Sequence, residues 1–231
     1  MRKPKRARRN THQNRNIAQN NSNEIRLETF LYFPTMISIA EIPEYLNVAK
    51  IVSNELLTKD ECCKVDEFYP VKMSEHLFAD ERLFGLRDTI LDLSWNILDQ
   101  QGYDMQYFRV ILTAMWTQQH HKYSSMEYHT HSGDQLVGFY FLKTPKGGSR
   151  PVFYDPRPAK VITDLPQKEN AEINASTNII NFTPEPGKVF ITNSFLPHSF
   201  TKNTSDEPTE FIHFNIKVIP YNPQNNDVEI V

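Results

Sequence analysis

The stretch HTHSGDQLVGFYFLKTPKGG, residues 129–148, carries the pattern that decides the fold. An apolar run at 137–142 is followed by a Gly-Gly turn at 146–149 and by a second apolar run at Val152–Tyr154. Aromatic and β-branched residues favour strands, and paired glycines favour the tight turns that join them. The stretch therefore predicts an antiparallel hairpin inside a β-rich domain.

Two helices are predicted ahead of this hairpin. Apolar side chains recur at helical spacing from about residue 44 to 57, and again from about 80 to 101. The segment between them, 58–80, is mixed and polar, so we expect a loop there. The earlier stretch 27–39 is rich in aromatic and β-branched residues and predicts a strand with a kink at Pro34.

Short strands dominate the second half of the chain. Further apolar or alternating runs predict strands at 107–116, 188–192 and 211–218. Residues 161–181 are polar with few apolar anchors and predict a long loop or lid. Two helices followed by many short antiparallel strands are typical of a jelly roll. We therefore expect a mainly β protein with N-terminal helices and a double-stranded β-helix core.

The charge of the chain is unevenly distributed. Residues 1–23 hold seven basic side chains, while all 28 acidic side chains lie beyond them. We expect a disordered basic arm over 1–23 and one folded domain over 24–231. Such an arm favours contact with nucleic acid or an acidic partner by charge neutralisation, or packing on another subunit of a homo-oligomer.

Composition excludes several classes of protein. No apolar run approaches the ~20 residues that a membrane span requires, and the N-terminus lacks the apolar segment of a secretory signal. Cys62 and Cys63 are adjacent, a spacing used neither by ordinary disulfides nor by zinc knuckles. We therefore expect a cytoplasmic protein, without a membrane partner, in a reducing compartment.

The histidines carry the clearest chemical signal. His129 and His131 are two residues apart, so on a strand both imidazoles point to one face. His198 lies far beyond them, after a turn and a predicted strand. A close pair of ligands and one distant histidine is the layout of the facial triad that holds non-haem iron. The neighbouring pair His120 and His121 is expected on the surface, and Trp116 in the core.

A series of short segments extends this signal over most of the chain. In order they are FPT at 33–35, Trp116, HTHSGDQLVGFYFLKTPKGG at 129–148, VFYDPR at 152–157, PGKVFITNSFLPH at 186–198 and FN at 214–215. From about residue 30 to residue 218 the chain resembles a family of 2-oxoglutarate- and iron(II)-dependent oxygenases found in bacteria and tailed phages. The resemblance implies a double-stranded β-helix, iron held by His129, His131 and His198, and 2-oxoglutarate as cosubstrate.

Two departures from the wider pattern concern the metal and the cosubstrate. Most relatives in the superfamily carry Asp where His131 stands, so a carboxylate from Glu127 or Asp134 is an alternative third ligand. The family usually has an Arg about eleven residues after the distal histidine, where it pairs with the far carboxylate of 2-oxoglutarate. Here that stretch is EPTE at 207–210, without a base. Side chains that could bind the cosubstrate instead are Lys143, Tyr140 and Arg157, with Lys217 and Arg150 as further cations.

The resemblance implies a dioxygenase that hydroxylates a substrate C–H bond, and the basic arm favours a macromolecular substrate. The missing Arg leaves two other hypotheses open. One is a catalytically degenerate β-helix protein with a structural or virion-associated role, in the host cytoplasm or the virion if the chain is phage-encoded. The other is a three-histidine iron dioxygenase of the cupin type that does not use 2-oxoglutarate.

Overall fold

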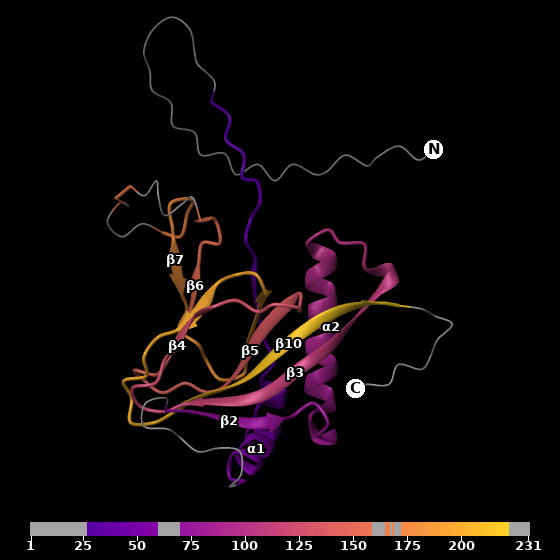
Figure 1. Ribbon diagram of the computed structural model, residues 1–231, viewed down its shortest axis with the longest axis vertical. Coiled ribbons are helices and arrows are strands. Elements are labelled where there is room, and N and C mark those ends of the chain that lie inside the picture. The colour runs from indigo at the N-terminus through magenta and orange to yellow at the C-terminus, as the bar shows by residue number, and fades with distance from the viewer. Residues whose placement is uncertain (1–26, 60–69, 159–164, 167, 169–171, 222–231) are drawn as a thin grey trace, which may run out of the picture. The chain divides into compact units, whose positions relative to one another are not determined.

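The computed structural model describes residues 27–59, 70–158, 165–166, 168 and 172–221 (Figure 1). The chain divides into two units, Met1–Pro34 and Thr35–Val231. In the first unit the described residues, 27–34, form no helix or strand, and the rings of Phe30 and Tyr32 lie 6.1 Å apart. The predicted basic arm at 1–23 lies outside the described residues.

The strands of the second unit form two antiparallel sheets (Figure 1). The larger sheet has the order β1 (Ile37–Glu41), β8 (Lys188–Asn193), β5 (Leu136–Lys143), β10 (Thr209–Pro220), β3 (Phe108–His120) and β2 (Val71–His76). The smaller sheet has the order β4 (Met126–His129), β9 (His198–Phe200), β6 (Pro151–Tyr154) and β7 (Ile179–Asn181). Along the chain, β3, β5, β8 and β10 enter the larger sheet while β4, β6, β7 and β9 enter the smaller one. This alternation between two sheets is that of a jelly roll, and it confirms the predicted double-stranded β-helix.

Two helices pack on the larger sheet. A short 3-10 turn at Pro43–Tyr45 leads into α1 (Leu46–Leu57), and another at Glu81–Leu83 leads into α2 (Phe84–Gln100). Both helices agree with the predicted spans. Their buried side chains, among them Val52 and Ile90, join one apolar core with residues from the outer faces of β5 and β10. A 3-10 turn at Met105–Tyr107 then leads into β3.

A second core lies on the opposite face of the larger sheet. It is built largely from aromatic side chains, namely Phe139, Phe141, Phe153, Phe190, Phe200 and Phe211. The two-residue period of a strand separates the two cores, because successive side chains point to opposite faces. On β10, Ile212 and Phe214 belong to the helix-side core, whereas Phe211 belongs to the aromatic core. Residues that share a face with Phe211 and Phe139 are therefore the ones available to a site between the sheets.

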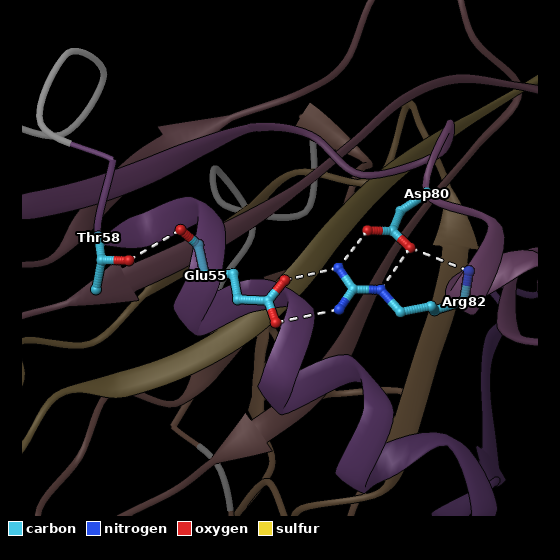
Figure 2. Close-up of polar contacts among 4 residues, drawn as sticks. All are labelled: Glu55, Thr58, Asp80 and Arg82. Carbon is cyan, nitrogen blue, oxygen red and sulfur yellow. Dashed lines mark hydrogen bonds and ion pairs between the residues drawn. The ribbon is translucent and has the colours of Figure 1, made fainter.

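One ion-pair cluster ties the end of α1 to the start of α2 (Figure 2). The Arg82 guanidinium donates to both carboxylate oxygens of Glu55 at 2.7 and 3.1 Å, and its Nε donates to Asp80 Oδ1 at 3.0 Å. Asp80 also accepts the backbone N–H of Arg82, so it caps the 3-10 turn. These hydrogen bonds lower the pKa of both carboxyl groups. The cluster lies at the surface, where ion pairs contribute little free energy, so it links the two helices without adding to the core.

Four predictions of secondary structure differ from the structure. The antiparallel hairpin predicted over 137–154 does not form, because β5 and β6 lie in different sheets and do not pair. The segment 58–80, predicted as a loop, contains β2 at the edge of the larger sheet. Its polar residues fit an edge strand, where one side faces solvent. The predicted strand at 27–39 is regular only from Ile37, and the loop predicted at 161–181 ends in the short strand β7.

Candidate metal centre

Three imidazoles converge between the two sheets. His129, His131 and His198 each offer a ring nitrogen, and these atoms all lie within 4.8 Å of one another. The ring centroids of His129 and His198 are 4.4 Å apart, and those of His131 and His198 are 5.2 Å apart. Three ring nitrogens gathered in this way match the protein half of a facial metal site.

Strand pairing brings these distant residues together. His129 at the end of β4 is the direct cross-strand partner of His198 at the start of β9. The pairing register shifts between Met126 and His129, which marks a bulge in β4. Bulges change the direction in which the side chains of a strand point, and they are common next to active sites. His131 lies just past the end of β4, where its backbone N–H donates to the Ser194 carbonyl at 3.0 Å.

Hydrogen bonds to backbone carbonyls orient two of the rings. His129 Nδ1 lies 2.7 Å from the Glu127 carbonyl oxygen, and His198 Nδ1 lies 3.0 Å from the Leu196 carbonyl oxygen. A carbonyl can only accept, so each Nδ1 carries the proton and each Nε2 keeps its lone pair. Metal-bound histidines in proteins are held in this way.

The free nitrogens fit a metal ion. The Nε2 atoms of His131 and His198 are buried and have no hydrogen-bond partner among the described residues. Burial lowers the pKa of each of these two histidines to about 4, with the neighbouring imidazoles acting in the same direction. Both rings are therefore neutral at physiological pH, as ligation requires.

The structure also distinguishes His131 from Glu127 and Asp134 as the candidate third ligand. Glu127 is exposed, and Asp134 accepts a hydrogen bond from Thr113 Oγ1 at 2.8 Å. Neither carboxylate joins the group of converging atoms that His129, His131 and His198 form. The structure therefore favours His131 over the two carboxylate alternatives.

A cavity of about 70 Å³ adjoins the histidines. Besides His129, His131 and His213, it is lined by Met73, Trp116, Gln118, Met126, Phe139 and Phe200. These walls are apolar or neutral, with no Lys, Arg, Asp or Glu among them. A small molecule bound there would be shielded from water on the side of the aromatic core.

His213 is a site residue that the sequence reasoning did not single out. It lies on β10 directly opposite Trp116 of β3 and Phe139 of β5, and its ring is 4.9 Å from that of His131. Burial lowers its pKa well below the usual value, with the three neighbouring imidazoles adding to the effect. The alternation FIHFNIK at 211–217 was the available signal, because it places His213 on the face of Phe211.

None of the three predicted cosubstrate residues lines the cavity. Tyr140 lies on the opposite face of β5, in the helix-side core, where its hydroxyl donates to the Ile42 carbonyl at 2.9 Å. Lys143 lies four residues beyond Phe139, roughly 13 Å at the rise of a strand, past a register shift and at the point where it pairs with Glu210. Its ammonium pairs with Glu207 at 2.9 Å, and Arg157 pairs with Asp155 at 2.6 Å.

Tyr140→Phe tests this placement. The substitution removes the donor to the buried Ile42 carbonyl, so we expect the free energy of unfolding to fall by about 1–2 kcal/mol. Iron and 2-oxoglutarate affinity should stay unchanged, because the hydroxyl points away from the histidines. Chemical denaturation and metal titration of the same preparation measure both quantities. A loss of 2-oxoglutarate affinity at unchanged stability would return Tyr140 to the cosubstrate site.

Thr209 occupies the position eleven residues after His198, where the family carries Arg. Its side chain is buried, and Thr209 Oγ1 accepts the backbone N–H of Ser149 at 2.8 Å. Phe211 follows on the same face of β10, stacked on Phe200 with ring centroids 4.6 Å apart. This aromatic pair stands along the strand between position 209 and the histidines.

The surface position predicted for His120 is wrong. Its side chain is fully buried, packed edge-on against Phe200 and Phe211, and hydrogen-bonded to Gln118 and Ser149. Burial lowers its pKa to about 3, with His121 contributing. His121 itself is half-buried and bonds Gln119 at 2.7 Å, outside the cavity wall.

Comparisons with known proteins agree with this geometry. Residues 114–215 match the model of the family described as "Putative 2OG-Fe(II) oxygenase", a span that contains His129, His131, His198 and His213. No protein with a curated description matches the chain. Within the described residues no helix is long and apolar enough to cross a membrane.

Solved structures share the fold at low sequence identity. A prolyl-4-hydroxylase from Pseudomonas putida aligns with a TM-score of 0.56 at 10% identity, over 79% of this chain and 93% of that one. AviO1 from Streptomyces viridochromogenes Tue57 aligns with a TM-score of 0.56 at 13% identity, over 84% and 93%. The epimerase SnoN, in complex with Fe3+, alpha ketoglutarate and nogalamycin RO, aligns with a TM-score of 0.52 at 12% identity, over 81% and 82%. At these identities the likeness shows the fold.

Proposed function

We infer that this chain, an oxidoreductase of the 2OG-Fe(II) oxygenase type by its family match, holds Fe(II) through His129, His131 and His198. The observation that carries the assignment is the convergence of three ligand nitrogens within 4.8 Å, two of them buried without partners in the described chain. Imidazole is a ligand that suits iron, and three of them on one side leave positions open for a chelating cosubstrate.

Neighbouring residues of the chain fix the tautomers and the neutral charge state of the proposed metal ligands. The carbonyls of Glu127 and Leu196 fix the tautomers of His129 and His198, so that both Nε2 lone pairs face the centre. Burial keeps His131 and His198 neutral, and the aromatic wall at Phe139 and Phe200 excludes water. Fe(II) held by these residues would supply, with 2-oxoglutarate and dioxygen, the oxidation of a substrate C–H bond, and 2-oxoglutarate would be converted to succinate and carbon dioxide.

The substrate class is proposed from charge. Residues 1–23 carry seven basic side chains and no acidic one, which favours an acidic macromolecule such as a nucleic acid or an acidic protein. Hydroxylation of such a partner, held near the domain by the basic arm, is the activity that we propose. Deletion of residues 1–23 should then weaken substrate binding while leaving iron binding unchanged.

An anaerobic titration tests the cofactor assignment. Fe(II) and then 2-oxoglutarate are added to the purified protein, and we expect stoichiometric iron followed by a visible charge-transfer band that saturates with 2-oxoglutarate. On admission of oxygen, slow formation of succinate without added substrate is expected. His121→Gln is the matched control, because it removes a histidine that lies outside the cavity wall. Failure to take up iron would refute the proposal, and iron without the band would refute its cosubstrate.

A further inference from the structure

His213 is a buried histidine that the three-ligand centre leaves unused. Its side chain is 4% exposed, and its Nδ1 is buried without a hydrogen-bond partner in the described chain. Buried polar atoms in proteins are almost always hydrogen-bonded, so each exception requires an explanation. His213 lines the cavity beside His131, so a molecule bound in the cavity would lie against its ring.

Aromatic packing fixes the His213 ring in place. Trp116 stacks on it with ring centroids 4.2 Å apart and planes 12° from parallel, and Phe139 meets it edge-on at 5.3 Å. Trp116 Nε1 is also buried without a partner in the described residues. The cavity wall therefore has two stacked N–H-bearing rings, and His213 Nδ1 and Trp116 Nε1 have no hydrogen-bond partner among the described residues.

The geometry separates His213 from the metal ligands. The atoms that converge within 4.8 Å come from His129, His131 and His198, and His213 is not one of that group. A molecule within hydrogen-bond reach of His213 nevertheless lies close to the metal, because the ring of His131 is only 4.9 Å away. The cavity wall holds no Lys or Arg, so apart from the proposed metal ion only uncharged donors could hydrogen-bond an anionic ligand there.

We propose that His213 hydrogen-bonds the metal-chelating end of 2-oxoglutarate, with Trp116 as the positioning residue that holds its ring. This inference rests on the proposed function, since it assigns a residue to the cosubstrate of that same centre. A carboxylate accepts well from neutral N–H donors in a site that excludes water, where each hydrogen bond is stronger than in solvent.

The test compares His213→Phe with the wild-type protein in the anaerobic titration. Phenylalanine keeps the stacked ring but removes both nitrogens, so we expect at least a tenfold rise in the 2-oxoglutarate dissociation constant with full iron content. His213→Gln returns an N–H donor and should recover part of the affinity. Trp116→Phe keeps the stack and should raise the constant less. His121→Phe removes a histidine outside the cavity and should leave it unchanged.

The outcomes are distinguishable. Equal 2-oxoglutarate affinity in wild type and His213→Phe overturns the inference and leaves the proposed function standing. Loss of iron together with 2-oxoglutarate in both His213 variants assigns the residue to the metal centre and also overturns it. If the wild-type protein itself forms no band, the proposed function fails and the inference falls with it. Should His213→Phe not fold, Trp116→Phe and His213→Gln decide on the same readouts.

Discussion

His198→Ala is expected to abolish detectable Fe(II) binding, a loss of at least about 100-fold in affinity, more than the 10–100-fold typical of residues that only support a ligand. His198 is 1% exposed, its tautomer is fixed by the Leu196 carbonyl, and its Nε2 has no other partner in the described chain. Two remaining imidazoles cannot hold the ion in a facial arrangement. Iron content after anaerobic loading and desalting measures the loss, and circular dichroism checks the fold.

His131→Asp gives the matched comparison at the same centre. A carboxylate at this position restores the two-histidine, one-carboxylate set that many non-haem iron sites use, so we expect iron to be retained within about tenfold. His131→Ala should lose it. If His198→Ala or His131→Ala kept wild-type iron content, the metal would have to lie elsewhere. If His131→Asp behaved like His131→Ala, the neutral third ligand would be required here.

The convergence of His129, His131 and His198 could be predicted in part because the signal of the first two is local and periodic. The two-residue spacing of His129 and His131 predicted two rings near one point, and the family-like segment at 186–198 supplied His198 as the distant partner. In the structure, however, His129 and His131 do not lie together on one regular strand. β4 ends at His129, a bulge precedes it, and His131 is positioned by its backbone bond to Ser194. The sequence pattern predicts which histidines converge, but it does not predict the backbone path that orients their rings.

The residues that would bind the cosubstrate could not be predicted in the same way, because β5 and β10 are buried on both faces. A strand buried on both faces reads as a continuous apolar run, so its sequence does not tell which residues face a site. The run VGFYFL at 137–142 therefore left Tyr140 and Phe139 equivalent, and only the structure assigns Tyr140 to the helix side. His213 was missed although the alternation FIHFNIK shows which residues share its face, because that pattern does not tell which face of β10 lines a site. β2 escaped prediction because its polar side chains are those of an edge strand.

Gly138→Ala is expected to destabilise the fold by about 3 kcal/mol, the upper part of the range for overpacking a core. A Cβ at position 138 would overlap the Phe214 ring and would lie 2.7 Å from the backbone carbonyl oxygen of Phe190. The ring can move only by displacing the helix-side core, and the carbonyl belongs to β8, which is paired with β5 at this point. For a domain of this size the melting temperature should fall by about 6–12 °C.

Gly138→Ala should also affect iron binding, because the neighbouring Phe139 ring contacts both His198 and His213. Gly102→Ala is the matched control. It has positive φ but open space around its Cβ, so it should cost only about 1–2 kcal/mol of backbone strain and leave iron binding intact. Phe214→Leu should recover part of the stability lost in Gly138→Ala, since it relieves the ring but not the carbonyl contact. A Gly138→Ala protein as stable as wild type would mean that the sheet relaxes at β8. The close approach of β5 and β8 would then play no part in holding Phe139 against the histidines.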